Sequence, residues 1–346
     1  MSEEVKKKNS KIGGYTPTQE LSSGAMGNLW LCHDPSLDRM VVVKQVLDSL
    51  EERDDVVKRF MREGNILAHL NHPAIIQPHA LWKEKDGKLS LSMEFVHGVT
   101  LRQVLDCCSQ PPLWVVMNIL YEVLNALGHA HRNGVVHRDL KPANIMIDKD
   151  GRIRLLDFGI ARTEMSLKNI EESLTMTGAI LGTVTYMSPE QTLGEEATGA
   201  SDLFAVGVIA LEMLLGENIF RGENFSDTIK RVQKLKVTQK AFDKNVPVKL
   251  RKLVLRLLAK KPKNRPVSAN DAADELALFM KDLPRDMTPY TSLWVQSAKD
   301  GKSSENVQNY TDPPHYPSSN KAKFATGFLS GAIAAGLITS LVFWLI

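Results

Sequence analysis

The chain has 346 residues, of which 43% are hydrophobic and 24% are charged, as is usual for a folded protein of roughly two domains. The net charge of +3 is too small to indicate a nucleic-acid-binding surface, so we expect no nucleic-acid partner. Three cysteines without metal-ligand spacing (Cys32, Cys107 and Cys108) predict reduced thiols. The charged residues 1–11 predict a disordered N-terminus without a signal peptide.

Residues 12–96 have the pattern of a small, strand-rich unit. A β-branched run at residues 41–46 and an alternating run at residues 89–95 predict strands. Between them, residues 55–70 carry apolar side chains at helical spacing, which predicts a helix.

Residues 97–283 are mainly helical by the same criteria. A long apolar stripe predicts a helix that ends at Gly134, and a turn at residues 149–151 joins two short strands. Further helices are predicted at residues 201–215, 248–259 and 270–280.

The C-terminal part of the chain changes composition twice. Residues 284–323 are rich in Pro, Ser, Asn, Asp and Lys, which predicts a disordered juxtamembrane tether. Residues 324–346 carry no charge, and a helix over the last 21 of them would be about 31 Å long, which matches a bilayer core of about 30 Å. Lys321 and Lys323 precede this predicted transmembrane helix, so we expect the preceding domain in the cytoplasm and a single-pass membrane protein.

Small residues follow one face of the predicted transmembrane helix. Gly327, Gly331 and Ala335 are spaced as in helix pairs that pack closely, which suggests a homodimer. Small residues are also common in single spans, so the monomeric alternative stays open.

Residues 21–30, which read LSSGAMGNLW, contain an incomplete glycine-rich pattern. Gly24 and Gly27 are three residues apart, and Ser22 stands where a phosphate-covering loop has its first glycine. Two glycines most often form an ordinary turn, so this pattern needs support from the rest of the chain.

That support comes from two later motifs, HRDLKPAN at residues 137–144 and DFG at residues 157–159. The other motifs in the same order are VVVK ending in Lys44, a helix bearing Glu63, SPE at residues 188–190, and Asp202 before an apolar helix. In this set the chain resembles the protein-kinase family, and it is most similar to bacterial serine/threonine kinases of the eukaryotic (Hanks) type. Over residues 12–283 the resemblance implies an α+β, two-lobed fold, with a β-rich lobe at residues 12–96 and a larger helical lobe at residues 97–283.

The residue types suit phosphoryl transfer, in which catalysis is mostly positioning and charge neutralisation. Asp157 and Asn144 offer hard oxygen ligands for Mg²⁺, with Mn²⁺ as an alternative. Asp139 would accept or orient the proton of the attacking hydroxyl.

Further catalytic roles are implied by the resemblance. Lys44 holds the α- and β-phosphates of ATP and is positioned by Glu63. Lys141 meets the γ-phosphate, and Thr183 holds Asp139 and Lys141 in place. A lysine two residues after the catalytic aspartate is typical of kinases that act on Ser and Thr of protein substrates.

The resemblance also implies the nucleotide pocket. Its loop contains Ser22, where a serine that needed a positive φ would stiffen the loop and modestly weaken ATP binding. Val42 replaces the usual alanine and should narrow the adenine slot. The predicted nucleotide contacts are Ser22, Gly24, Gly27, Leu29, Val42, Lys44, the gatekeeper Met93, the hinge residues Glu94 and Val96, and Met146.

A Thr-x-Thr pair, Thr175 and Thr177, lies in the long segment between DFG and SPE. The resemblance suggests autophosphorylation there, and a phosphate could pair with Arg138 and order the segment. An exposed polar loop without this role is the alternative.

Three other residues are predicted to be structural. In the family, Glu190 and Arg265 form a buried ion pair, and Asp202 receives backbone donors from the catalytic loop. The favoured interpretation is an active membrane-anchored serine/threonine kinase; the alternatives are a catalytically weak nucleotide-binding scaffold and a small-molecule kinase. SPE and Lys141 favour a protein substrate.

Overall fold

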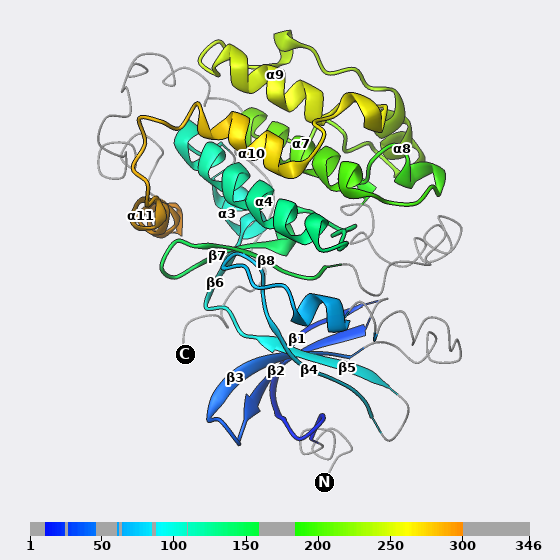
Figure 1. Cartoon of the computed structure of the whole chain (residues 1–346), viewed down its shortest axis with the longest axis vertical. Helices are drawn as coiled ribbons and strands as arrows, with labels where there is room; N and C mark the ends of the chain where they lie inside the picture. The colour runs from blue at the N-terminus through cyan, green and yellow to red at the C-terminus, as the bar shows by residue number, and fades with distance from the viewer. Residues whose placement is uncertain are drawn as a thin grey trace, which may run out of the picture.

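The computed structural model of the chain describes residues 11–24, 27–45, 61, 64–84, 88–108, 110–158 and 184–299. They form a small lobe built on a β-sheet and a larger helical lobe, joined by the chain between the fifth and sixth strands (Figure 1). The predicted two-lobed α+β architecture is therefore confirmed. The predicted disordered residues 1–10 and the predicted transmembrane helix lie outside the described residues.

The small lobe contains an antiparallel sheet with strand order β1-β2-β3-β5-β4. Side chains alternate between the two faces of a strand, so Val41 and Val43 pack on one face, and Val42 and Lys44 lie on the other. The strands are β1 (Thr16–Gly24), β2 (Gly27–Asp34), β3 (Arg39–Gln45), β4 (Pro78–Lys83) and β5 (Leu89–Glu94).

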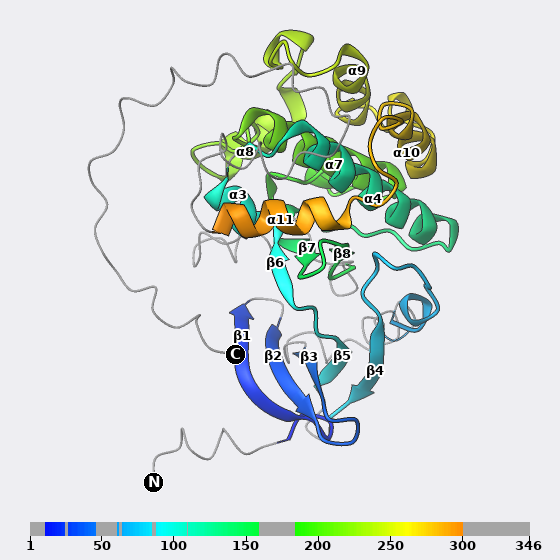
Figure 2. The same ribbon diagram turned by 90° about the vertical axis from the view of Figure 1, so that its left-hand side faces the viewer.

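A second sheet, with strand order β6-β7-β8, borders the helical lobe on the side of the small lobe (Figure 2). Its strands are β6 (Gly98–Thr100), β7 (Ile145–Asp148) and β8 (Ile153–Leu155). The backbone N–H of Leu155 donates to Ala74 O at 2.6 Å, and Ile75 forms a parallel bridge with Leu155. These bonds tie the end of β8 to the small lobe.

The helices of the larger lobe surround one continuous apolar core. Helix α7 is buried along nearly its whole length, which explains the unbroken apolar run from Leu203 to Leu211. The helices are α3 (Leu101–Cys107), α4 (Leu113–Arg132), α7 (Gly199–Leu215), α8 (Phe225–Lys234), α9 (Val248–Leu257), α10 (Ala269–Ala277) and α11 (Thr288–Lys299). The sequence pattern predicts α4, α7, α9 and α10, with ends within a few residues, but not α3, α8 or α11.

Helix α11 corrects the prediction that residues 284–323 are a disordered tether. Residues 288–299 form a helix whose Thr291, Trp294 and Val295 are buried. With Met287, these residues recur at helical spacing, so the amphipathic signal was present but was hidden by the surrounding polar composition. Among the helices that the structure describes, none is both long and apolar enough to cross a bilayer.

Candidate active site

The catalytic-loop motif places three of the predicted residues in direct contact. Lys141 Nζ donates to Asp139 Oδ2 at 3.0 Å. The amide nitrogen of Asn144 donates to the Asp139 backbone oxygen at 2.8 Å and to Asp139 Oδ2 at 3.3 Å. A short 3₁₀ turn, η2 (Pro142–Asn144), produces this proximity, because it brings Asn144 back toward Asp139.

Lys44 and Asp157 join the two lobes. Lys44 Nζ lies 2.9 Å from Asp157 Oδ1, across 113 residues of sequence. Burial opposes the charge of Asp157, but the ammonium of Lys44 outweighs it and holds the pKa of this carboxyl below its usual value. Burial and the nearby Lys44 charge together lower the pKa of Lys141. The centre therefore concentrates two ammonium groups and two carboxylates in one partly enclosed site.

Asn144 and Asp157 lie at the same edge of the second sheet. Ile145, which follows Asn144, is the register partner of Leu155, two residues before Asp157, and the N–H of Leu156 donates to Asn144 O at 2.9 Å. An amide oxygen and a carboxylate suit a hard divalent cation, which in such sites takes its remaining ligands from phosphates and water. Among the described residues, no cluster of three or more His, Cys, Asp or Glu side chains is suited to a metal.

Asp157, in this centre, and Arg138, next to Asp139, have a left-handed backbone conformation that non-glycine residues rarely adopt. Arg138 has φ +65° and Asp157 has φ +46°. Such conformations cost about 1–3 kcal/mol each and persist only where the surrounding structure fixes them. Both residues are in motifs of the predicted active site, which fits a backbone held for function.

Asp202, at the start of α7, fixes the backbone of the catalytic loop. Its carboxylate accepts from the N–H of His137 at 2.8 Å and from the N–H of Arg138 at 2.9 Å. His131 Nε2 lies 2.8 Å from the same carboxylate, which is only 2% exposed. The predicted scaffold role of Asp202 is confirmed by these contacts.

His137 is a site residue that the sequence analysis overlooked. Its Nε2 donates to Leu156 O at 2.9 Å, and its ring lies 4.7 Å from the Phe158 ring. Burial lowers the pKa of His137, so the ring is neutral at physiological pH. His137 therefore holds the segment that carries Asp157 to the catalytic loop. The signal was its position in HRDLKPAN.

The predicted ion pair between Glu190 and Arg265 is also confirmed. The guanidinium of Arg265 donates to both carboxylate oxygens of Glu190, at 2.6 and 2.8 Å. Burial opposes the charge of Glu190, but its hydrogen bonds with Arg265 hold the pKa below the usual value. Because both side chains are buried, this bidentate pair fixes the segment after the activation region to the helical core.

The glycine-rich pattern forms the β1–β2 hairpin. Gly24 pairs with Gly27, and Ser22 pairs with Leu29. Gly27 has φ +126°, which only glycine adopts easily. Ser22 is not among the residues of positive φ, so the predicted steric penalty at Ser22 is wrong. A serine fits here, next to an irregularity in the strand pairing between Glu20 and Ser22, because the backbone needs no positive φ.

Some of the residues predicted to line the adenine slot lie together in the structure. Met93 and Val96 belong to one buried cluster, against which Val42 and Met146 pack. The carboxylate of Glu94 forms an ion pair with Arg154, which leaves only the backbone of Glu94 for adenine. Four other predicted site residues lie outside the described residues: Glu63, Thr175, Thr177 and Thr183.

Comparisons with known proteins agree with this geometry. Residues 15–276 match the family model described as "Protein kinase domain". The chain is 35% identical over 260 residues to the serine/threonine-protein kinase PrkC of Bacillus subtilis, covering 75% of this chain and 39% of that protein. It is 36% identical over 274 residues to the serine/threonine-protein kinase pkn3 of Myxococcus xanthus, covering 77% and 50%. The chain thus matches half or less of the length of these relatives.

Among solved structures, the chain is similar to the PknI kinase domain of Mycobacterium tuberculosis. The TM-score is 0.62 at 26% identity, with 78% of this chain and 97% of that domain covered.

Proposed function

Because the chain belongs to the protein kinase family, we propose that it transfers the γ-phosphate of ATP to Ser and Thr hydroxyls of proteins. The observation that carries this proposal is the linked set of charges at the lobe boundary. Lys44 pairs with Asp157, and Lys141 pairs with Asp139. Two ammonium groups for phosphate oxygens, beside two carboxylates for a cation and a hydroxyl, are what phosphoryl transfer requires.

Family membership implies ATP and a divalent cation, and we favour Mg²⁺ over Mn²⁺. Asn144 and Asp157 would hold the cation, whose charge would offset that of the phosphates. Asp139 orients the attacking hydroxyl and takes up its proton, a role worth about 10²–10⁴-fold in rate. Lys44 and Lys141 neutralise phosphate oxygens. The predicted partner of Lys44 is Glu63, and the predicted partner of Lys141 is Thr183.

The catalytically weak scaffold remains the alternative. It rests on Ser22 and Val42, and the lack of a positive φ at Ser22 argues against the strain on which the first reason depends. Val42 and Met146 both pack against the cluster that contains Met93, which supports a narrow adenine slot. The four charged residues of the centre are all present, and they favour an active enzyme.

Two finer features belong to the same proposal. We expect autophosphorylation at Thr175 or Thr177, with Arg138 as the phosphate partner. We also expect residues 324–346 to anchor the kinase in a membrane with its catalytic domain in the cytoplasm, and the small-residue face to permit a homodimer.

The test is transfer of labelled γ-phosphate by the full chain in detergent, followed by mapping of the modified residues. Asp157→Asn should lower transfer about 100-fold or more. The matched control is Asp274→Asn, the same change at an exposed position on α10, which should leave transfer unaltered. Nucleotide binding without transfer by the unaltered chain would instead support the scaffold.

A further inference from the structure

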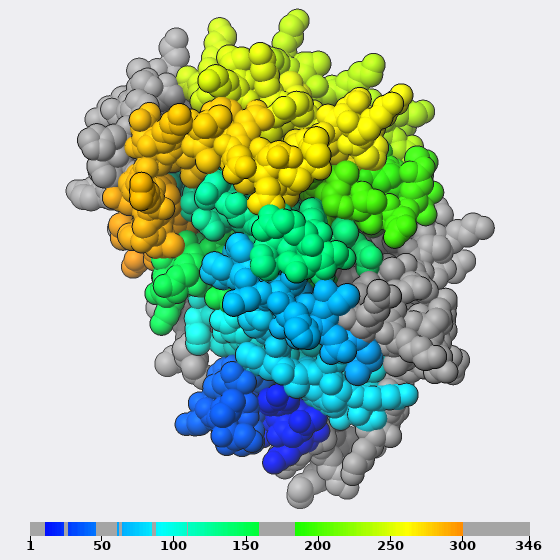
Figure 3. Space-filling model, viewed as in Figure 1, coloured from blue at the N-terminus to red at the C-terminus, as the bar shows by residue number. Residues whose placement is uncertain are grey.

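Helix α11 lies beyond residue 276, where the match to the kinase family model ends. It crosses the helical lobe beside α3, directly above β6 and β7 in the view of Figure 2. In the space-filling view, its orange surface forms one flank of the helical lobe (Figure 3). This additional helix therefore lies next to the sheet that carries part of the candidate active site.

The inner face of α11 is part of the helical-lobe core. Trp294 is 1% exposed, and the Tyr290 ring lies edge-on to Trp114 at 6.5 Å. The amide of Asn118, on α4, donates to the buried hydroxyl of Thr291 at 3.2 Å. Since a buried hydrogen bond and a buried tryptophan require a fixed geometry, α11 is an integral part of the lobe.

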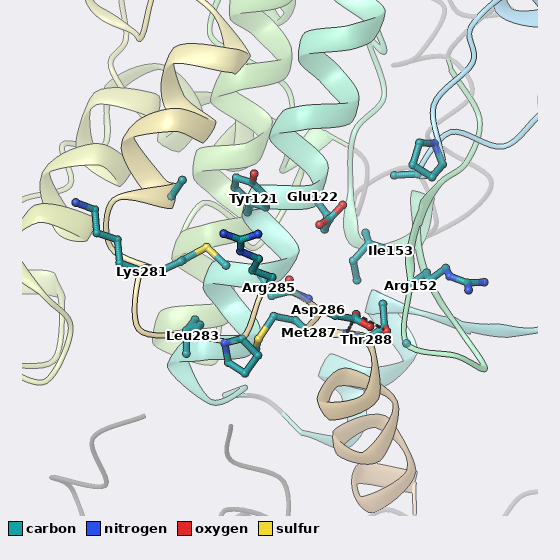
Figure 4. Close-up of a pocket in the computed structure, with 17 residues that line it drawn as sticks. Tyr121, Glu122, Arg152, Ile153, Lys281, Leu283, Arg285, Asp286, Met287 and Thr288 are labelled. Carbon is teal, nitrogen blue, oxygen red and sulfur yellow. Dashed lines mark hydrogen bonds between the residues drawn. The ribbon is translucent and has the colours of Figure 1, made fainter. Parts of the chain in front are cut away.

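The segment that leads into α11 is packed less closely. A cavity of about 590 Å³ separates it from α4, and Tyr121, Arg285 and Met287 are among the lining residues (Figure 4). The cavity leaves the segment before α11 with fewer packing contacts to α4. The position of α11 therefore depends mainly on the contacts that the helix itself makes.

One of these contacts is to the β7–β8 turn. The hydroxyl of Ser292 donates to Lys149 O at 2.8 Å. Gly151, with φ +88°, lies so close that a Cβ atom there would stand 2.0 Å from Thr288 O and 2.7 Å from Ser292 N. The turn and the helix therefore fit together only with glycine at this position.

The opposite side of the same turn contacts the chain that joins the lobes. The N–H of Lys149 donates to His97 O at 2.8 Å, and His97 directly follows the hinge residue Val96. The turn thus lies between α11 and the hinge. Strand β7, which leads into this turn, carries Met146 of the adenine slot.

We propose that α11 is a positioning element for the nucleotide. It holds the β7–β8 turn against the hinge, and so fixes the spacing between Met146 and the hinge backbone. This inference rests on the proposed function, since it concerns the ATP site of the same enzyme. It assigns a role in substrate binding to a helix outside the matched family domain.

The experiment compares two glycine substitutions in the full chain. Gly151→Ala would displace α11 from the turn. Gly194→Ala imposes the same left-handed strain, at φ +77°, but its Cβ would meet no atom within 4 Å. The readout is the Kd for a fluorescent ATP analogue with Mg²⁺, together with KM and kcat where transfer is observed.

We expect Gly151→Ala to raise Kd and KM about fivefold with little change in kcat, and Gly194→Ala to leave both within about twofold. Equal Kd values for the two variants would overturn the inference. Binding by the unaltered chain without transfer would overturn the proposed function but not this inference, so the two failures are distinguishable.

A milder pair guards against misfolding of Gly151→Ala. Ser292→Ala removes only the hydrogen bond to Lys149 O, whereas Ser297→Ala makes the same change on α11 at a side chain for which no such bond is observed. Ser292→Ala should raise Kd about twofold and Ser297→Ala should not. Identical Kd values in this pair would also count against a positioning role.

Discussion

The two lobes hold their site residues in different ways. In the helical lobe, Asp139 and Asn144 are fixed by hydrogen bonds to each other, and Asp202 fixes the backbone before them. In the small lobe, Lys44 is held by its place in β3, and its observed side-chain partner, Asp157, comes from beyond the helical-lobe sheet. Among the described residues, the apolar clusters of the small lobe are also much smaller than the core of the helical lobe.

This difference predicts where substitutions are tolerated. A buried hydrogen-bond network has few acceptable replacements, because each lost partner leaves a polar group unsatisfied. A strand position needs only a residue with suitable backbone angles and a side chain that fits its face. We therefore expect large effects from changes to the polar network and small effects from many changes in the β1–β2 hairpin.

Outside the residues proposed to touch nucleotide or substrate, the largest effect is expected from Asp202→Asn. The amide is nearly the same size, but one of the two acceptor oxygens becomes a donor. Because the two oxygens accept from different residues, that donor would face the N–H of either His137 or Arg138. Each buried donor left unsatisfied costs about 1–3 kcal/mol of stability. A shift of the catalytic loop should also lower kcat about 100-fold. Thermal unfolding and steady-state kinetics would measure both effects.

Asp274→Asn again serves as the exposed control. If Asp202→Asn lowered the melting temperature but left kcat unchanged, Asp202 would support only the fold. The hydrogen-bond network of the helical lobe would then matter for stability and not for catalysis.

An intermediate effect is expected on the pH dependence of stability, through the ammonium group of Lys260. Its ammonium lies 4.8 Å from the Phe220 ring centre and 5.3 Å from that of Phe204. Burial, together with the positive charge of Arg265, lowers the pKa of Lys260 from 10.5 to about 8. The folded protein thus binds this proton less tightly than the unfolded chain does.

The sign of the pH effect follows from this difference. Between about pH 8 and pH 10.5 the unfolded chain holds more protons, so the contribution of Lys260 to stability rises with pH. Lys260→Met removes the titrating group. Denaturant unfolding at pH 7 and pH 9.5 should show the unaltered protein gaining stability relative to Lys260→Met. A constant difference between the two proteins would show that Lys260 titrates normally.

Much of the site was predictable because motif residues meet through short connections. HRDLKPAN predicted Asp139, Lys141 and Asn144 together, and a single 3₁₀ turn is enough to bring them into contact. The pairing of Lys44 with Asp157 was not predicted, because it depends on how the two lobes face each other.

Helix α11 shows a second limit of sequence reasoning. Its Pro, Ser and Thr residues have low helix propensity, and burial of Trp294 and Val295 overrides that preference. Only four buried positions recur at helical spacing in this polar region, which is a weak signal for a helix. The helix is stable because these side chains pack on α3 and α4, and the sequence pattern does not show that surface. A truncation at residue 285 would therefore remove part of the folded lobe.

The smallest effect is expected from Ser22→Gly, although this change restores the usual glycine of the loop. Ser22 pairs with Leu29 in β1 and does not have a positive φ, so glycine gains nothing in steric freedom and loses some strand stability. We expect the Kd for an ATP analogue to change less than about twofold. Gly27→Ala should weaken binding more, because residue 27 has φ +126°. If Ser22→Gly improved the affinity by more than Gly27→Ala weakened it, position 22 would be under backbone constraint. The β1–β2 hairpin would then tolerate substitutions no better than the helical lobe does.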